Sequence, residues 1–477
     1  MISRAAGFSI VIVLWAILYL PLLGALELRG EEGKRVMPAV QMLDGGDYLV
    51  PYLGARPYLN KPPLINWLVA SAFRVFGARN EWTARLPSAI SVLVVALLFV
   101  AMVRTNFGAG ASIIAAISWL TPLELINKGR TIETDAINAS LFAVALILWL
   151  MLWQRERSPW LTFTVPWIFL GLGILAKGPG ILLFFYSIFI AVTWRTNDLG
   201  KLLHPAHLVG IAILLSVFAA WAVPFFRALD SQSFGQIWWR ELSAILFGEK
   251  GRSEHWILNF PRGIAYFLPW ILLLPFIRFD KIDNERERET ARGVFLGAVL
   301  PFVVVLLFPG SVPRYVLPLA APLSWLVGVA AANSAFEWRL KNIPLSPTVV
   351  RWGIAITIAT EIVGFPIRTA WDAKGHQVLK PTAGQINAVV PRGESLYALG
   401  LAYAPYLFYV GARVHYLSAL EQLPADARFL LIQSRDLPKM ESDARWNAVQ
   451  PKLLTRTNFF RSHDTMIFSV TANRSNP

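Results

Sequence analysis

Long apolar runs alternate with short polar segments over the first 370 residues of the chain. A helix needs about 20 mainly apolar residues to cross the hydrocarbon core of a bilayer. Runs of this kind occur at 7–27, 84–104, 109–125, 136–153, 160–176, 179–194, 206–226, 262–278, 292–309, 313–332 and 350–370. The first run is long for a signal peptide, and no small-residue cleavage site clearly ends it. We therefore expect a polytopic α-helical membrane protein with about 11–13 transmembrane helices.

Lysine and arginine are distributed unevenly between alternate gaps in this pattern, and such cations concentrate on the cytoplasmic side of membrane proteins. One set of gaps is short and rich in cations, including the run RFDKIDNERERETAR at 278–292. The other set contains the long segments 28–83 and 227–261 and everything after about residue 371. Both sets carry cations, so the two sets differ only in how densely the cations occur. We expect the first set to face the cytoplasm and the second to lie outside it.

The composition changes after about residue 371. ESLYALGLAYAPYLFYVGARVHYLS and ARFLLIQSRD mix short β-prone runs with polar turns, and DTMIFSVTANR has the pattern of a last strand. The sequence therefore predicts a transmembrane domain at 1–371 and a small extracytoplasmic α/β domain at 372–477.

The overall composition agrees with a membrane protein and excludes several kinds of site. The 477 residues are 55% hydrophobic and 16% charged, with a mean hydropathy of +0.50, a balance far from that of soluble domains. Cysteine is absent, so neither disulfides nor cysteine-ligated zinc can form. The net charge is +14, but the basic residues are scattered through short gaps and form no single basic module. We therefore expect membrane lipids as partners, and no nucleic acid.

The segment 28–83 is too long for a connector and too apolar for a solvated loop, so we expect functional structure there. After Glu31 and Glu32, apolar residues at helical spacing predict a short helix. A second apolar helix, at 64–77, is too short to span the bilayer and suits the plane of the membrane interface. Lys61 lies at the proline corner that leads into this second helix.

Each of these charged residues also has an ordinary structural explanation. The helix dipole favours acidic side chains at a helix start, which accounts for Glu31 and Glu32 without any catalytic role. A lysine at the membrane interface commonly extends its amine toward water, which accounts for Lys61. Composition and spacing leave both interpretations open.

The order of motifs in this segment resembles the first extracytoplasmic loop of membrane glycosyltransferases of the GT-C type. That family has an acidic pair opening a helix, then GDW-V-P, Y-KPPL--W and RLPSA. The corresponding stretches here are GEEGKRVMPAVQML, GDYLVP, YLNKPPLINW and RLPSAI. The chain looks most like bacterial enzymes similar to the aminoarabinose transferase of lipid A, with protein O-mannosyltransferases as more distant relatives. TIETDAINAS, GILAKGPG and PRYVLPLAAPLSWLVG extend the resemblance over about residues 1–370.

The resemblance implies a GT-C-like fold and a glycosyltransferase that takes its sugar from a polyprenyl-phosphate carrier. The acceptor would be lipid A or lipopolysaccharide, another glycolipid, a glycan or a protein. Both hexosyl and pentosyl donors remain open. The resemblance places the protein in the bacterial inner membrane with its active site on the extracytoplasmic side, in agreement with the orientation expected from the charges.

Glycosyl transfer from a lipid phosphate needs cations for the leaving phosphate and a carboxylate for the acceptor hydroxyl. The resemblance implies that Lys61 and Tyr315 contact the donor phosphate. Glu31 is the first candidate for the catalytic carboxylate, with Glu32 beside it. Asp135 is the second, because an acidic residue entering a span is costly unless it is used or paired.

Further outer cations could add to the phosphate site, namely Arg252, Arg262 and Arg314. Arginines also mark membrane interfaces without binding a ligand. Similarly, Asp135 with Thr134 suits a helix N-cap, and Lys177 in AKGPG suits an interfacial lysine. The structural and functional interpretations of these residues stay open.

Two departures from the family pattern concern its carboxylates. Glu31 replaces the usual aspartate, so its carboxylate is carried on a side chain one methylene longer. Asn60 stands before the lysine of the KPP motif, where relatives often carry an acid that can help to hold a metal. A divalent metal ion is therefore left with Glu31 and His255 as candidate ligands, and a lone histidine beside Trp256 also suits a structural role.

Two other classes of protein share part of this pattern. A transporter or lipid flippase also has many spans and a few charges at membrane level. However, the sequence has no inverted repeat, and its charges cluster in outer loops. A non-catalytic assembly protein is the third interpretation. A soluble nucleotide-sugar donor is disfavoured, because GLGILAKGPG lacks the spacing of a phosphate-binding loop.

Overall fold

The computed structural model describes residues 3–229, 239, 243, 256–340, 343–344, 346–375, 377–401, 403–457 and 464–470. Contacts between residues divide the chain into two compact units. Unit 1 comprises Met1–Leu23, Leu59–Leu68 and Trp82–Ile367, and unit 2 comprises Gly24–Tyr58, Val69–Glu81 and Arg368–Pro477. We call the segment 28–83 the first outer loop after its expected orientation, and much of it groups with the C-terminal residues. The domain bounds 1–371 and 372–477 stay a prediction from composition.

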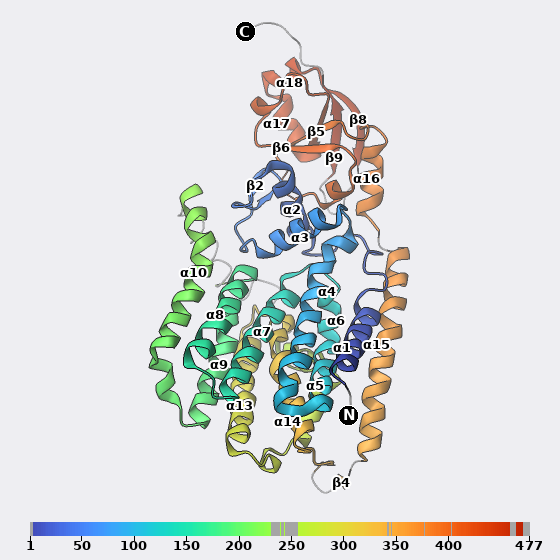
Figure 1. Ribbon diagram of the computed structural model, residues 1–477. Coiled ribbons are helices and arrows are strands. Elements are labelled where there is room, and N and C mark those ends of the chain that lie inside the picture. The colour runs from blue at the N-terminus through green and yellow to red at the C-terminus, as the bar shows by residue number, and fades with distance from the viewer. Residues whose placement is uncertain are drawn as a thin grey trace. The chain divides into compact units, whose positions relative to one another are not determined.

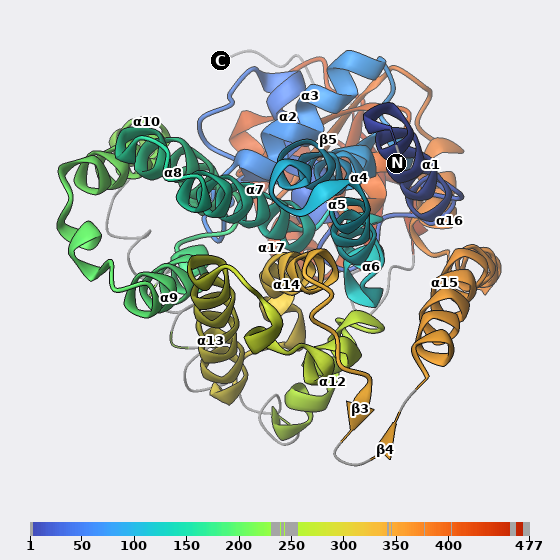
Figure 2. The same cartoon turned by 60° about the horizontal axis from the view of Figure 1, so that its bottom comes forward.

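Unit 1 is built mainly from helices (Figure 1). Its α-helices are α1 (Arg4–Tyr19), α4 (Glu81–Leu98), α5 (Arg104–Leu120), α6 (Leu123–Gly129), α7 (Thr134–Gln154), α8 (Pro159–Ala176), α9 (Gly180–Arg195), α10 (Pro205–Ala228), α12 (Asn259–Ala265), α13 (Glu285–Leu307), α14 (Ala320–Ala332) and α15 (Pro347–Gly375). Shorter elements are η1 (Phe99–Val103), η2 (Leu199–Leu203), η3 (Trp256–Leu258), η4 (Trp270–Phe276), η5 (Phe279–Lys281), η6 (Pro313–Leu319), β3 (Arg339–Leu340) and β4 (Ile343–Pro344). Figure 2 shows α4, α5, α7 and α14 inside the bundle, with α10 and α15 at opposite rims.

The predicted polytopic membrane fold is confirmed. Among the described residues, seven helices are long and apolar enough to cross a membrane: Glu81–Ala101, Thr134–Gln154, Pro159–Ala176, Pro205–Ala228, Glu285–Leu307, Pro313–Ala332 and Pro347–Gly375. The number is nine if each of two bent pairs is one span: Phe107–Leu120 with Leu123–Gly129, and Trp256–Ala265 with Trp270–Phe276. The two remaining predicted spans coincide with α1 and α9, which have only 16 residues each.

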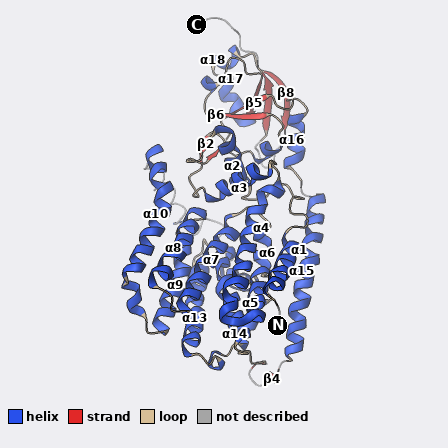
Figure 3. Cartoon of the chain, in the orientation of Figure 1, coloured by secondary structure: helices blue, strands red, loops and turns tan. Residues whose placement is uncertain are grey.

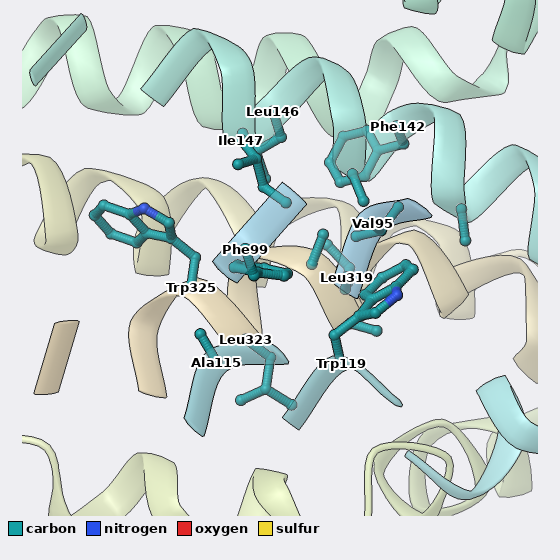
Figure 4. Packing of buried hydrophobic residues seen from close by; sticks show 14 of the residues in the cluster. Val95, Phe99, Ala115, Trp119, Phe142, Leu146, Ile147, Leu319, Leu323 and Trp325 are labelled. Atoms are coloured by element: carbon teal, nitrogen blue, oxygen red, sulfur yellow. The ribbon is translucent and has the colours of Figure 1, made fainter. Parts of the chain in front are cut away.

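Large aromatic side chains fill the centre of unit 1. Trp119 and Trp325 are almost completely buried and lie around Phe99 and Leu319 (Figure 4). The indole N–H of Trp119 donates to the carbonyl oxygen of Val92 at 3.0 Å, as a polar group removed from water requires. These contacts hold α4, α5 and α14 together.

Glycines allow two pairs of helices in unit 1 to approach closely. Gly210 of α10 lies against the carbonyl group of Phe163 in α8, and Gly297 of α13 lies against the backbone of Ile188 in α9. A side chain at either glycine would collide with this backbone. Small residues at such crossings let helices pack without the hydrophobic driving force available in water.

Unit 2 contains a mixed five-stranded sheet and short helices (Figure 3). Its elements are α2 (Gly33–Gly45), β1 (Tyr52–Leu53), β2 (Arg56–Pro57), most of α3 (Leu64–Phe76), α16 (Leu379–Asn387), β5 (Ser395–Leu399), η7 (Pro405–Tyr409), β6 (Arg413–Leu417), η8 (Leu420–Gln422), β7 (Phe429–Gln433), η9 (Ser434–Asp436), α17 (Leu437–Glu441), α18 (Ala444–Ala448), β8 (Lys452–Thr457) and β9 (Thr465–Ser469). The strand order is β6-β5-β7-β9-β8, with β5 parallel to both neighbours. The predicted C-terminal α/β fold is thus confirmed, with β9 as the last described strand.

The first outer loop contains the two predicted helices, α2 and α3. The chain just before α2 is anchored to the helix α16. The buried carboxylate of Glu27 accepts hydrogen bonds from the backbone N–H groups of Val378, Leu379 and Lys380 at 2.7, 2.9 and 3.1 Å. An anion at a helix N-terminus satisfies N–H groups that have no partner within the helix. This acid therefore links two segments of unit 2 that lie far apart in sequence.

Candidate functional site

A buried carboxylate at the start of α7 holds two cations. Asp135 lies in the first turn of α7, and its side chain is only 4% exposed. Its Oδ1 lies 2.6 Å from Nζ of Lys177, and its Oδ2 lies 3.5 Å from Nε of Arg314. Lys177 is the C-cap of α8, and Arg314 lies in η6. Three segments far apart in sequence therefore bring their charges together.

The AKGPG corner accounts for the place of Lys177. Gly178 has a φ of +124°, a conformation that favours glycine because it has no Cβ. Pro179 follows as the N-cap of α9. This turn ends α8 at Ala176 and leaves Lys177 at the C-cap, where the helix dipole favours a cation.

An aromatic ring contacts the same lysine. Nζ of Lys177 lies 4.6 Å from the centroid of the Tyr315 ring, within the range of a cation–π interaction. Tyr315 follows Arg314 in η6, so one turn supplies both residues to the cluster. The corner before this turn is held by Asn259, whose side-chain N–H donates to the carbonyl oxygen of Ser311 at 3.0 Å.

A second group of ions lies in α6 and the turn after it. Nζ of Lys128 lies 2.8 Å from Oε2 of Glu133 and 4.0 Å from Oε1 of Glu124. All three side chains are largely buried. The backbone N–H of Glu124 donates to the carbonyl oxygen of Tyr266, which fixes the start of α6. Glu133 is the N-cap of α7 and Asp135 lies in the first turn of the same helix, so the two groups adjoin and form one cluster.

We call this set the ion cluster of unit 1, and its members are Glu124, Glu133, Asp135, Lys128, Lys177 and Arg314. Three carboxylates and three cations balance one another. The three carboxylates and Lys128 are largely buried, and such buried charges are stable only when they are paired. An additional anion that enters the cluster would therefore compete with the carboxylates for their cations.

Unit 2 carries the acidic pair of the first outer loop. Glu32 is 1% exposed and is the N-cap of α2, and its Oε2 accepts a hydrogen bond from the backbone N–H of Arg29 at 2.9 Å. The side chain of Glu31 is 41% exposed, with Oε1 2.8 Å from Nζ of Lys34 and Oε2 4.0 Å from Arg35. The Glu32 carboxylate is therefore buried and bonded to the backbone of its own turn, whereas the Glu31 carboxylate remains accessible to solvent.

Two tyrosines lie beside this acidic pair. The buried guanidinium of Arg35 donates to the hydroxyl of Tyr58 at 2.9 Å. Burial, and next the negative charges of Glu31 and Glu32, raise the pKa of Tyr403 to about 12. Tyr403 therefore keeps its proton at neutral pH and can act only as a hydrogen-bonding group there.

The residues singled out in the sequence fall into two groups. Unit 1 contains Asp135, Lys61, Arg262, Arg314 and Tyr315, and unit 2 contains Glu31 and Glu32. Asp135 contacts both Lys177 and Arg314, and Tyr315 contacts Lys177. Lys61 is partly buried before α3, and Arg262 is exposed on α12. Arg252 and His255 lie outside the described residues. The catalytic and phosphate-binding roles of all these residues stay predictions.

Sequence reasoning missed the second ion group and Tyr403. The segment ELINKGRTIETD does place Glu124, Lys128, Glu133 and Asp135 within 12 residues. Such a density of charge between two spans is a usable signal. Tyr403 could not be found in this way, because it lies in the C-terminal segment and reaches α2 only through the tertiary fold.

No metal centre is visible in the part of the chain that the structure describes, where no three or more His, Asp or Glu side chains gather as a metal site. Of the two candidate ligands, Glu31 is paired with Lys34, and His255 is not among the described residues. The described donor set thus does not fit a divalent ion, and no step of the reaction is derived through one.

Comparison with known proteins finds similarity to glycosyltransferases. The family model described as dolichyl-phosphate-mannose-protein mannosyltransferase matches residues 60–223. Undecaprenyl phosphate-alpha-4-amino-4-deoxy-L-arabinose arabinosyl transferase 2 of Pseudomonas fluorescens is 26% identical over 64% of this chain and 55% of its own length. The protein of the same name in Proteus mirabilis is 22% identical over 68% of this chain and 59% of its own length. The chain spans about half the length of these curated relatives.

Solved structures share the fold. The crystal structure of ArnT from Cupriavidus metallidurans in the apo state superposes with a TM-score of 0.70, at 16% identity over 98% of this chain and 97% of that one. The same protein bound to undecaprenyl phosphate gives a TM-score of 0.69, at 17% identity over 99% of both chains. These likenesses confirm the GT-C-like fold that the resemblance implied, and the resemblance itself is supported by the matching family model and the curated relatives.

Proposed function

We propose that this integral membrane protein, which has the fold of ArnT and resembles GT-C-type glycosyltransferases, transfers a sugar from a polyprenyl-phosphate carrier to an acceptor. The observation that carries the proposal is the pairing of Lys177 and Arg314 with the buried carboxylate of Asp135, with the Tyr315 ring against Lys177. A structural ion pair would need only one cation. Two cations around one acid provide charged groups that a phosphate can recruit.

The leaving group of the reaction is the carrier phosphate. As the bond between the anomeric carbon and the phosphate oxygen breaks, the electron pair stays on that oxygen and negative charge develops there. Lys177 and Arg314 would stabilise this charge, because cations held in place beforehand need no reorganisation during the reaction. Lys61 and the hydroxyl of Tyr315 would add contacts to the phosphate. Asp135 would act as a positioning residue that keeps the two cations in place.

The acceptor hydroxyl attacks the anomeric carbon and must lose its proton. Glu31 fits this task better than Asp135 or Glu32, since its side chain is 41% exposed. Asp135 already faces two cations, and Glu32 is buried in its turn. In the proposed step the hydroxyl oxygen bonds to the sugar, its proton moves to Glu31, and the polyprenyl phosphate leaves.

The donor and the location follow from the relatives as proposals for this chain. Two curated relatives are named for undecaprenyl phosphate-4-amino-4-deoxy-L-arabinose, and one solved ArnT structure holds undecaprenyl phosphate. A pentosyl donor on a polyprenyl phosphate is therefore the first choice, with a hexosyl donor second. The acceptor is a lipid A-like glycolipid, another glycan or a protein. We place the active site at the extracytoplasmic face of the bacterial inner membrane.

The test uses the full chain in lipid nanodiscs with undecaprenyl-phosphate-linked aminoarabinose or mannose and a panel of acceptors. Mass spectrometry should detect free undecaprenyl phosphate together with an acceptor that has gained the sugar mass. Lys177→Met should lower the initial rate by about 100-fold or more, as expected when a charge-stabilising group is lost. Consumption of no donor, under conditions in which ArnT is active, would contradict the function.

A matched control exists within the same unit. Lys201 also pairs with an aspartate, since its Nζ lies 2.9 Å from Oδ1 of Asp198, and it also lies over an aromatic ring, 4.3 Å from the centroid of Trp153. Lys201→Met therefore removes the same two kinds of interaction away from the ion cluster, and its rate should stay within about twofold of wild type. Equal losses in the two variants would mean that Lys177 has only a structural role.

A further inference from the structure

A large cavity lies entirely within unit 2, between the first outer loop and the C-terminal sheet. Its volume is about 1420 Å³, whereas a pocket for a drug-sized ligand typically measures about 300–1,000 Å³. The first loop contributes α2, β1 and residues 79–81, and the C-terminal part contributes Tyr397 of β5, η7 and β6. Figure 1 shows α2 and β2 beside β6. The cavity has room for more than one sugar ring.

The acidic side chains that line the cavity all have partners. Asp44 is 2.7 Å from the Arg79 guanidinium, and Glu81 is 2.7 Å from Nζ of Lys380. Oδ1 of Asp47 accepts hydrogen bonds from two backbone N–H groups at 2.8 and 3.2 Å. Asp44 and Glu81 are therefore neutralised by cations, and Asp47 is held by the backbone of its own turn.

Two arginines line the cavity from the C-terminal part of unit 2. Arg392 precedes β5 and Arg413 begins β6, and both are exposed and line the cavity. Among the described residues neither guanidinium has an ion-pair partner, whereas Arg79 in the same cavity does. Two guanidinium charges on this side of the cavity thus lack a carboxylate partner among the described residues. Guanidinium groups bind phosphate and carboxylate through two parallel hydrogen bonds, so an anionic ligand fits this side.

Aromatic rings lie next to these arginines. Tyr397 of β5 and His415 of β6 stack with their centroids 5.2 Å apart and an interplanar angle of 26°. His415 is two residues from Arg413, so the two side chains share one face of the edge strand β6. A pyranose ring has apolar C–H faces and a polar rim, and it therefore needs flat rings beside hydrogen-bonding groups. Nε2 of His415 lies 3.3 Å from Oγ of Ser395, which holds the ring in place.

We infer that this cavity binds an anionic saccharide of two or more rings, with its phosphate or carboxylate on Arg392 and Arg413. Describing this saccharide as part of the acceptor rests on the proposed function. The helix α2 supports that description, because Glu31 lies two residues before its start and Met37, Gln41 and Asp44 of its later turns line the cavity. A helix of 13 residues is about 20 Å long, a length that an acceptor with several sugars can span.

The experiment measures binding without any turnover. The full chain in nanodiscs is titrated calorimetrically with trehalose 6-phosphate, a disaccharide uronic acid, unphosphorylated trehalose and inorganic phosphate. The two charged disaccharides distinguish phosphate from carboxylate recognition. We expect the better charged disaccharide to bind at least tenfold more tightly than trehalose, and also more tightly than inorganic phosphate. Binding of inorganic phosphate alone would overturn the inference, as would no binding of either charged disaccharide.

Variants assign the binding to the cavity. The double substitution Arg392→Ala, Arg413→Ala should weaken binding of the charged disaccharide at least tenfold and leave the binding of trehalose unchanged. The double substitution Arg392→Lys, Arg413→Lys should recover part of the binding of the charged disaccharide. Arg435→Ala is the control, since Arg435 is an exposed arginine of the same unit outside the cavity, and it should bind as wild type. Binding that survives both double substitutions would overturn the inference.

The two proposals can fail separately. Sugar transfer from the polyprenyl donor without any saccharide binding at the cavity would leave the proposed function standing and remove the cavity site. Saccharide binding that depends on both arginines, in a protein that consumes no donor, would retain the site and remove the transferase. The edge strand β6 also offers backbone groups to an extended peptide. Displacement of the disaccharide by neutral extended peptides at equal affinity would show a peptide groove and overturn the saccharide assignment.

Discussion

The starts of α7 and α2 both carry acidic side chains, but these side chains differ in burial and in the cations around them. At α7 the carboxylate of Asp135 is 4% exposed and faces the cations Lys177 and Arg314. At α2 the carboxylate of Glu31 is 41% exposed and its nearest cation, Lys34, lies one turn along the same helix. A buried acid can organise cations because its charge is poorly screened. An exposed acid can instead be reached by a substrate and can exchange a proton.

The largest effect is expected from Asp135→Asn. This substitution leaves Lys177 and Arg314 without their shared anion, and we expect the transfer rate to fall about 1,000-fold. Because both cations are partly exposed, the loss of unfolding free energy should be about 2 kcal/mol, less than for a fully buried pair. The measurements are initial rates by mass spectrometry and thermal unfolding in nanodiscs.

The double variant Asp135→Asn, Lys177→Met separates the effect of Asp135 on the transfer rate from its effect on the stability of the fold. Removing both partners eliminates the unpaired charge, so part of the lost stability should return while the rate stays low. If the rate recovered together with stability, the cluster at α7 would be structural only. The contrast between the two helix starts would then disappear.

Hydropathy predicted the membrane part of the fold because a chain in lipid must satisfy its backbone hydrogen bonds within helices. All eleven apolar runs therefore coincide with helices or bent helix pairs. The pairing of Asp135 with Lys177 and Arg314 could not be predicted from the residues alone, because it joins segments 42 and 179 positions apart through tertiary packing. The family resemblance indicated the segments but not which side chains contact one another.

The different burial of the adjacent residues Glu31 and Glu32 could not be predicted from the sequence either. Glu31 and Glu32 are chemically identical, and the motif presents them as one acidic pair. The structure separates them, since Glu32 closes a turn on Arg29 and Glu31 remains accessible. Glu27, which carries the same chemistry, caps α16 instead. Burial depends on contacts with residues 370 to 410, and no local pattern around residue 30 encodes those contacts.

A smaller effect on the rate is expected from Glu31→Gln. The amide keeps the size of the side chain but cannot accept the acceptor proton, so kcat should fall about 100-fold with little change in the KM for the donor. Thermal unfolding should hardly change, because exposed ion pairs contribute at most about 1 kcal/mol. Glu394→Gln is the matched control, since its side chain is 40% exposed and also pairs with a cation, Arg428. Undiminished transfer in Glu31→Gln would remove Glu31 from the reaction.

The smallest effect is expected at Tyr403, which reports the charge of the acidic pair. Burial, and next the charges of Glu31 and Glu32, raise the pKa of Tyr403 to about 12, compared with about 10 in an unfolded chain. A raised pKa favours the protonated side chain in the fold, so its stabilising contribution is complete below about pH 10 and is lost as the pH rises through about 12. Tyr403→Phe has no such proton, and its melting temperature should fall less between pH 9 and pH 11 than that of the wild type.

The same measurement in the Glu31→Gln background tests whether the exposed carboxylate is charged next to this tyrosine. Removing one negative charge should lower the pKa of Tyr403, and the difference between the tyrosine and phenylalanine proteins should then shrink. Transfer by Tyr403→Phe at pH 7 should stay within about threefold of wild type, because the hydroxyl contributes only a hydrogen bond of 3.4 Å to the carbonyl oxygen of Gly30. An unchanged difference in the Glu31→Gln background would mean that Glu31 carries no charge effective at Tyr403, and the exposed acid at α2 would lose its role as a proton acceptor.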